Sequence, residues 1–128
     1  MAASKSTLAP LQSIVYATGE TAILQNAALY QSVSADMTAM LPAGAASTLK
    51  PLGFSRYDQT SGQTNIEVIT AGECLATAGA AITAGDDLES AGTTGKVQTR
   101  TTGSIIARAL DSAGADGDVI RVRIIQPT

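Results

Sequence analysis

The chain has 128 residues and a net charge of −3, a length that suits one domain with a modest core. Its eight Lys and Arg residues are scattered, which argues against nucleic-acid binding, because phosphate contacts need concentrated positive charge. Histidine is absent, which excludes Ser-His-Asp catalysis and the usual zinc sites, and the single cysteine, Cys74, excludes an intramolecular disulfide.

The core must be built from small aliphatic side chains, because Trp is absent and only one Phe and three Tyr occur. At ~25 cal/mol per Å² of apolar surface, Ala-rich packing gives a shallow core. This composition indicates that further burial comes from other subunits. A small Ala-rich β domain without such partners is the alternative.

The first residues carry one lysine and no long apolar run, so they do not resemble a signal peptide. No stretch approaches 18 consecutive apolar residues, so we expect no membrane span and a soluble product made in the cytoplasm. The Ala, Ser and Thr around Pro10 predict an arm over residues 1–15 that packs poorly by itself. A single β-rich domain is then expected over residues 16–128.

Residues 13–41 are the hardest part of the chain to interpret. They contain short apolar runs that periodicity cannot assign, and we expect strands with one short helical turn. Residues 48–54 predict a strand interrupted by Pro51, which is typical of an edge or a bend. Residues 65–69 alternate and predict a further strand.

Residues 78–125 read as short aliphatic strands separated by glycine turns, with strands expected over 88–90, 96–98, 104–110 and 119–125. In the last strand Ile120, Val122 and Ile124 alternate with two arginines, the period-2 pattern of a strand with one buried face. Arg121 and Arg123 are expected on a solvated face or as salt-bridge donors.

Two repeats occur in this part of the chain. The Ile-Thr-Ala-Gly-acid sequence of residues 69–73 recurs at 82–86, and we expect the same turn twice. On a longer scale, residues 52–68 parallel residues 106–122 as strand, loop and strand. Such repetition suits a small barrel or sandwich made of two similar halves, although chance similarity is possible in so Ala-, Gly- and Thr-rich a chain.

No segment carries a convincing set of reactive groups. Residues 92–96 resemble a phosphate loop, but the glycine spacing is wrong and Val97 stands where a metal-binding Ser or Thr is needed. Asp86, Asp87 and Glu89 are three acids in four positions, and Asp87 and Glu89 share a strand face, which could bind a cation or form a catalytic pair. Acids beside a turn, however, usually cap backbone N–H groups or face water. The acidic loop 111–118 is more simply an exposed hairpin connection. Cys74, without any imidazole, is expected to be a small buried hydrophobe.

The order of motifs within residues 78–125 carries a resemblance. AAITAGDDLESAGTTGKVQ followed by GSIIARALDSAGADGDVIRVRII is similar to the C-terminal half of phage capsid cement, or head decoration, proteins. The similarity extends back to about Ala45, so residues 45–125 are the part it supports best. It departs from the family at Ala107, where glycine is more usual.

The resemblance implies a small β-barrel or β-tulip-like domain with an extended N-terminal arm. It further implies a homotrimer on the virion surface that binds the major capsid protein of the expanded head, without enzymatic activity or a cofactor. The arm is then expected to bind the shell through five residues, Leu8, Pro10, Leu11, Ile14 and Val15. The alternatives are a lipoyl- or biotinyl-type carrier domain with Lys96 near a hairpin tip, and, disfavoured by the lack of histidine, a hydrolase.

Overall fold

The computed structural model describes residues 12–18, 22–32, 34, 36–58 and 65–125. In these ranges every regular element is a β-strand. The described part therefore contains no helix, and none that could cross a membrane. The mainly β fold predicted from the sequence is confirmed.

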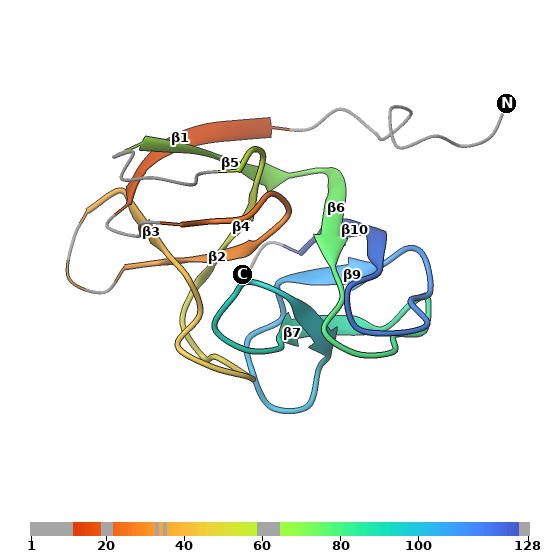
Figure 1. Cartoon of the computed structure of the whole chain (residues 1–128). Helices are drawn as coiled ribbons and strands as arrows, with labels where there is room; N and C mark the ends of the chain where they lie inside the picture. Colours follow the sequence, from red (N-terminus) through yellow and green to blue (C-terminus); the bar gives the residue numbers. More distant parts are fainter. Residues whose placement is uncertain (1–11, 19–21, 33, 35, 59–64, 126–128) are drawn as a thin grey trace, which may run out of the picture.

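The first half of the molecule is a closed five-stranded barrel in the order β1-β3-β2-β4-β5 (Figure 1). Its strands are β1 (Gln12–Thr18), β2 (Ala28–Gln31), β3 (Thr38–Met40), β4 (Pro51–Ser55) and β5 (Asn65–Ala71). The antiparallel β1–β5 pair forms its longest seam, and a short parallel β1–β3 pair closes it.

The second half is a five-stranded sheet in the order β6-β10-β9-β7-β8. Its strands are β6 (Glu73–Thr77), β7 (Asp87–Ser90), β8 (Val97–Thr99), β9 (Ala107–Ala109) and β10 (Val119–Ile124). The chain passes from one half to the other at Gly72, whose φ of 90° turns β5 directly into β6.

The two halves share one topology. Strands β1, β5, β4, β2 and β3 follow one another around the barrel as β6, β10, β9, β7 and β8 do in the second sheet. Where β1 and β3 close the barrel in parallel, β6 and β8 approach through one parallel bridge between Ala78 and Val97. The two end strands of the second sheet therefore approach each other at the position where β1 and β3 pair in the barrel.

The repeated hairpins also share their register. In the β4–β5 hairpin Phe54 faces Ile69, and in the β9–β10 hairpin Arg108 faces Arg123, the same pair of positions in the longer repeat. The first residue of each loop, Arg56 or Leu110, donates its backbone N–H to the matching carbonyl on the returning strand. The strand–loop–strand repeat predicted from the sequence is therefore a structural repeat.

A left-handed turn precedes the second strand of each half. Asn26 has a φ of 67° and Gly85 a φ of 96°, and asparagine is the residue that best replaces glycine in this conformation. Asn26 donates its N–H to the Ser55 carbonyl at 3.0 Å, and Gly85 donates its own to the Ala109 carbonyl at 2.8 Å. Gly72 and Gly85 of the short repeat both have a positive φ, but the same turn does not form twice. Residues 69–71 belong to β5, which runs through Gly72 into β6, whereas the Asp86 N–H donates to the Thr83 carbonyl in a turn.

The hydrophobic core consists of two clusters. One fills the first barrel and includes Tyr16, Ile23, Leu29 and Val68. The other fills the second half and extends onto four outward-facing side chains of the first: Ala28, Tyr30, Phe54 and Ile69. Both faces of β2 are therefore buried, and the halves are held together by a shared core rather than by a linker alone.

The connection between β3 and β4 adds polar contacts at this junction. Ala46 donates its N–H to the Ser90 carbonyl at 2.9 Å, and the Ser90 hydroxyl donates to the Gly44 carbonyl at 2.7 Å. On the other side of the junction Gly95, with a φ of 95°, accepts from the Ala28 N–H at 2.8 Å. A Cβ on Gly95 would lie 2.4 Å from that of Ala27, so only glycine fits.

Several details differ from the sequence prediction. The helical turn expected within residues 13–41 is wrong for the described part of that stretch, where Asn26 adopts the left-handed conformation instead. The strand expected over 104–110 is limited to Ala107–Ala109, because Ser104 donates its N–H to Ser47 of the β3–β4 connection. Ala107 is fully buried between β7 and β10, so alanine fits where glycine is more usual.

Candidate functional site

The residues predicted to form the binding arm are only partly described. Leu8, Pro10 and Leu11 lie outside the described residues. Ile14 and Val15 belong to β1, where they pair with Val68 and Glu67 of β5. Their side chains are 37% and 58% exposed. The last residues assigned to the arm thus form part of the barrel wall and still present apolar surface.

Around Val15 the outside of the barrel carries a compact group of side chains. Glu67 lies opposite Val15, accepts from the Ser13 hydroxyl and forms an ion pair with Arg56 at 3.2 Å. The guanidinium carbon of Arg56 lies 5.5 Å from the ring centre of Tyr57, which is 56% exposed. We call this group, Ser13, Val15, Arg56, Tyr57 and Glu67, the β1–β5 face.

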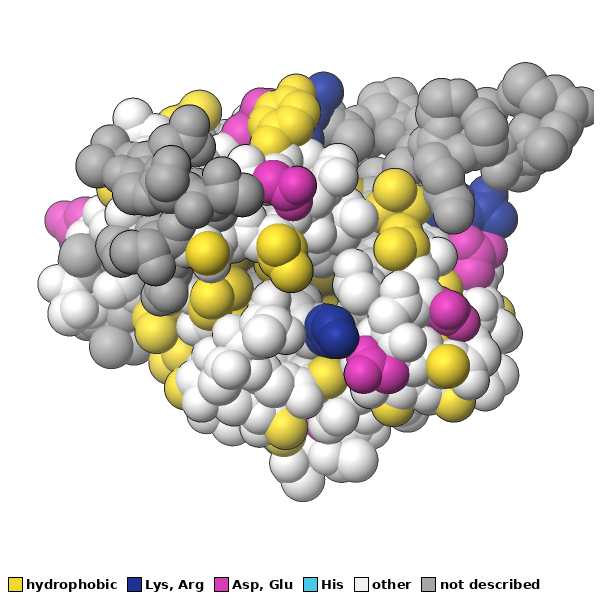
Figure 2. Space-filling model, in the orientation of Figure 1, with side chains coloured by type: hydrophobic (Ala, Val, Ile, Leu, Met, Phe, Trp, Pro, Cys, Tyr) yellow, Lys and Arg dark blue, Asp and Glu magenta, His cyan; other side chains and the backbone are white. Residues whose placement is uncertain are grey.

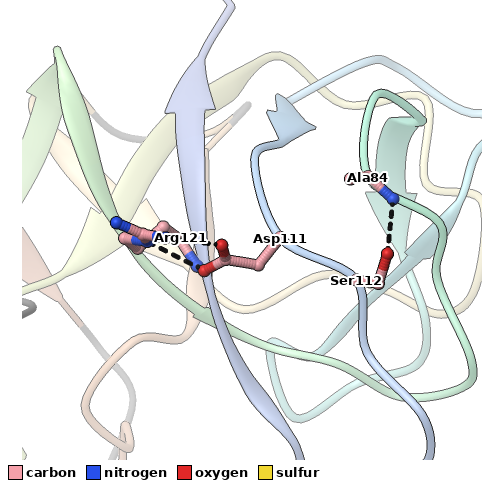
Figure 3. Close-up of polar contacts among 4 residues, drawn as sticks. All are labelled: Ala84, Asp111, Ser112 and Arg121. Atoms are coloured by element: carbon pink, nitrogen blue, oxygen red, sulfur yellow. Dashed lines mark hydrogen bonds and ion pairs between the residues drawn. The ribbon is translucent and has the colours of Figure 1, made fainter. Parts of the chain in front are cut away.

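The matching surface of the second half carries the charges in reverse. Leu75 of β6 lies opposite Arg121 of β10 as Val15 lies opposite Glu67. Arg121 donates to both carboxylate oxygens of Asp111, at 2.9 and 2.8 Å (Figure 3). Val119 and Leu110 flank this pair. We call the group Leu75, Leu110, Asp111, Val119 and Arg121 the β6–β10 face.

The Asp111 pair also fixes the backbone. The Asp111 carboxylate accepts from the Arg121 N–H at 3.0 Å, so one side chain binds both the main chain and the guanidinium. Hydrogen bonding to Asp111 raises the pKa of Arg121 above its ordinary value. Arg121 is therefore half-buried and bound, and Arg123 is exposed and pairs with Glu73 at 2.7 Å, so both arginines are salt-bridge donors, one of the two roles expected for them.

The acidic residues at the start of β7 and in the loop before β10 act as backbone caps and ion-pair partners. Asp86 accepts from the Thr83 N–H and the Thr99 hydroxyl, and Asp87 pairs with Arg108 at 3.1 Å. In the acidic loop Asp118 accepts from two backbone N–H groups, those of Gly114 and Ala115. Across the described residues no group of three or more potential metal ligands gathers. The capping interpretation is confirmed for Asp86, and Asp118 makes the same kind of contact in the exposed loop.

Glu89 is the polar residue whose importance the sequence did not reveal. Its carboxylate is fully buried and accepts from the side chains of Gln98 and Thr101 and from the N–H groups of Thr102 and Gly103. Burial alone would raise its pKa, but these hydrogen bonds outweigh it and lower the pKa to about 2. Glu89 is therefore an ionised structural anchor for the β8–β9 connection.

Tyr30, at the matching position of β2, lies beside this anchor. Its hydroxyl is buried near Ser90 and Glu89 and makes no hydrogen bond of normal geometry to the described residues. Burial raises the pKa of Tyr30 above its ordinary value. Tyr30 is therefore neutral at the junction between the two halves.

The remaining candidates for chemistry have structural roles. Lys96 follows the β7–β8 turn, and its ammonium pairs with Asp116 at 2.9 Å, which leaves the carrier alternative without a free lysine at that tip. Cys74 is buried, and burial raises the pKa of its thiol to about 12, so it is a small hydrophobe and not a thiolate nucleophile. On the face seen in Figure 2, Lys and Arg side chains are scattered among acidic and neutral ones.

Comparison with known proteins identifies the group to which the chain belongs. Residues 12–124 match the phage cement protein family. Among curated proteins none matches. The fold is similar to a solved structure, the head fiber gp8.5 N base in bacteriophage phi29, with a TM-score of 0.66 and 17% identity over 91% of this chain and 95% of that chain. Since the family match spans nearly all the described residues, the chain belongs to the phage cement protein family and is a phage structural protein.

Proposed function

We propose that the protein attaches to the outer surface of the expanded phage head, binds the major capsid protein and stabilises the shell. The observation that carries this proposal is the family match over residues 12–124. The side-chain chemistry agrees with it, since Asp86, Glu89, Lys96 and Cys74 are occupied in caps, ion pairs or the core. These roles support a structural function without catalysis.

The stabilisation is a linkage effect. A ligand that binds only the expanded lattice shifts the equilibrium toward that lattice by RT ln(1 + [L]/Kd), without any chemical step. The same ligand has no effect on a shell that it binds equally well before and after expansion. Selective binding to expanded heads is therefore the essential property.

We further propose that the protein is made in the host cytoplasm and acts as a homotrimer, so that three attachment points multiply a weak contact. The attachment points are the N-terminal residues Leu8, Pro10 and Leu11, continued by Ile14 and Val15 on β1. Exposure of Ile14 and Val15 supports this assignment, because the apolar surface of the arm then continues onto the barrel.

Co-sedimentation with phage heads tests the proposal. Purified protein is mixed with expanded, undecorated heads and with unexpanded heads, and the pelleted fraction is measured. We expect saturable binding to expanded heads alone and a rise in the temperature at which these heads lose their DNA. Equal binding to both forms, or no effect on heat resistance, contradicts the proposal.

A truncation and a matched variant locate the attachment. Removal of residues 1–11 deletes three of the five proposed contacts and leaves β1 complete, so the fold should persist while binding weakens. Val15→Ser removes one exposed methyl pair on the described part of the surface, and Leu24→Ser removes a similarly exposed aliphatic side chain, 59% exposed, from the β1–β2 connection. Weakening by Leu24→Ser but not by Val15→Ser would contradict the assignment of the attachment to β1.

A further inference from the structure

Most exposed large hydrophobic side chains of the described residues lie on or beside two surfaces. Val15 and Tyr57 lie at the β1–β5 face, and Leu110 and Val119 belong to the β6–β10 face, where Val119 is 42% exposed. Ile14 pairs with the buried Val68 and so lies on the other side of β1, while Leu24 and Met37 lie in the β1–β2 and β2–β3 connections. Apolar surface is thus concentrated where β1 and β5, and in the second half β6 and β10, face outward.

The two faces also match in charge. On each face an aliphatic residue lies opposite one charged residue of the paired strand. The charged strand residue forms an ion pair with an oppositely charged side chain from the adjacent hairpin. On the β1–β5 face the strand residue is Glu67, held by Arg56. On the β6–β10 face it is Arg121, held by Asp111 (Figure 3). If the faces are laid together, Glu67 can meet Arg121 while Arg56 meets Asp111.

We propose that the β1–β5 face of one copy docks on the β6–β10 face of the next copy. The inference rests on the homotrimer of the proposed function and specifies the surfaces that build it. Because the two faces differ, the contact is heterologous, and a heterologous contact closes into a ring when its rotation permits, as a three-fold assembly requires. In the ring, Leu75 and Val119 lie beside the contact, and the two ion pairs join into one four-charge network.

The contact is small. Each face is made of the five residues named above, fewer than the ~20–30 residues per partner of a standard interface. We therefore expect weak self-association in solution that becomes strong only when copies are concentrated on a shell. The charges would then act mainly by selecting the partner face and its register.

Charge reversal in a double-mutant series tests this pairing. Glu67→Arg and Arg121→Glu each place like charges across the contact, and each should weaken self-association about tenfold or more in sedimentation velocity at high protein concentration. The combined variant, Glu67→Arg with Arg121→Glu, restores opposite charges between copies and should recover most of the lost association. Circular dichroism of every variant reports whether the fold is kept.

The matched control is Asp87→Arg, a charge reversal of the same size on β7, outside both faces, which should leave self-association unchanged. Single variants that associate like the unaltered protein, or a double variant no stronger than the singles, overturn the proposed contact. Co-sedimentation with expanded heads separates this outcome from failure of the proposed function, because binding of unaltered protein to heads does not depend on these substitutions.

Discussion

The two halves of the molecule have one topology and opposite outer surfaces. Across β2, β4 and β5 a row of paired positions holds Ala28, Phe54 and Ile69, all buried by the second half. Across β7, β9 and β10 the same positions hold Asp87, Arg108 and Arg123. These charged residues form ion pairs at the surface, Asp87 with Arg108 and Arg123 with Glu73.

This difference shows what the shared fold fixes and what it leaves free. Inward-facing positions are apolar in both halves, as Val68 and Val122 illustrate, because each sheet must fill its own interior. The outward-facing row follows its neighbours instead: Ala28, Phe54 and Ile69 are apolar where the second half covers them, whereas Asp87, Arg108 and Arg123 are charged and reach the surface. A charged outer row also disfavours stacking of a further unit on that side, as capping units do in repeat proteins.

The largest effect should come from the inward positions that the halves share. Val68→Asp and Val122→Asp each bury an unpaired carboxylate, which costs several kcal/mol, comparable to the whole stability of a small domain. Because one hydrophobic cluster spans both halves, we expect either substitution to unfold the entire described fold. Amide NMR spectra check this: native signals that persist in one half would show that the halves fold independently.

The next effect concerns the covered row. Phe54→Ala removes a fully buried ring at the junction and should destabilise the protein by about 3–5 kcal/mol, as large-to-small core substitutions do. Urea unfolding measures the loss. A loss below about 1 kcal/mol would mean that the second half does not depend on this row for its core.

Glu89 and Tyr30 occupy matching positions in the two halves, and only Glu89 should make the stability of the protein depend on pH between 6 and 2. The pKa of Glu89 is lowered from 4.5 to about 2, so its contribution to stability is fully present above pH 4.5 and is lost as the pH falls toward 2. The shift corresponds to about 3 kcal/mol. Unfolding free energies measured between pH 6 and pH 2 should fall by about that amount more in the unaltered protein than in Glu89→Gln.

Glu89→Gln is also expected to be destabilised at neutral pH, because its amide keeps one acceptor oxygen where the carboxylate offers two. Tyr30→Phe is the matched control at the equivalent position: it removes a hydroxyl that has no partner of normal geometry among the described residues. Its stability should equal or exceed that of the unaltered protein. An equal pH dependence in the Gln variant would contradict the role assigned to Glu89.

Much of the second half could be predicted because its signals are local. The alternation of Ile120, Val122 and Ile124 and the repeated Ile-Thr-Ala-Gly sequence each lie within a few residues. The structure confirms the buried face of the strand and gives both glycines a positive φ. The first half was obscure because asparagine at position 26 replaces the glycine that marks the same turn at Gly85. An isoleucine three residues before an Asn or Gly, at Ile23 and Ile82, is the signal that could have revealed the full repeat.

The surfaces could not be predicted in the same way. The β1–β5 face joins Val15, Arg56 and Glu67, and the anchor of Glu89 depends on backbone groups a full connection away. Such groups meet only through strand pairing, which short-range patterns do not specify. The same limitation applies to β1, whose residues 12–15 were assigned to the arm although they pair along β5.

The smallest effect should come from the exposed row. Arg108→Ala and Arg123→Ala break ion pairs whose arginine side chains are more than half exposed, and pairs of this kind contribute about 0–1 kcal/mol because water and salt screen them. We expect each substitution to change the unfolding free energy by less than about 0.5 kcal/mol, against several kcal/mol for Phe54→Ala at the position that matches Arg108. Melting curves at low and high salt check this, since the small loss should shrink further as salt increases. A loss for Arg108→Ala close to that for Phe54→Ala would mean that the second row is covered as well, by another copy or by the shell, and the charged surface would then have to be counted as an interface.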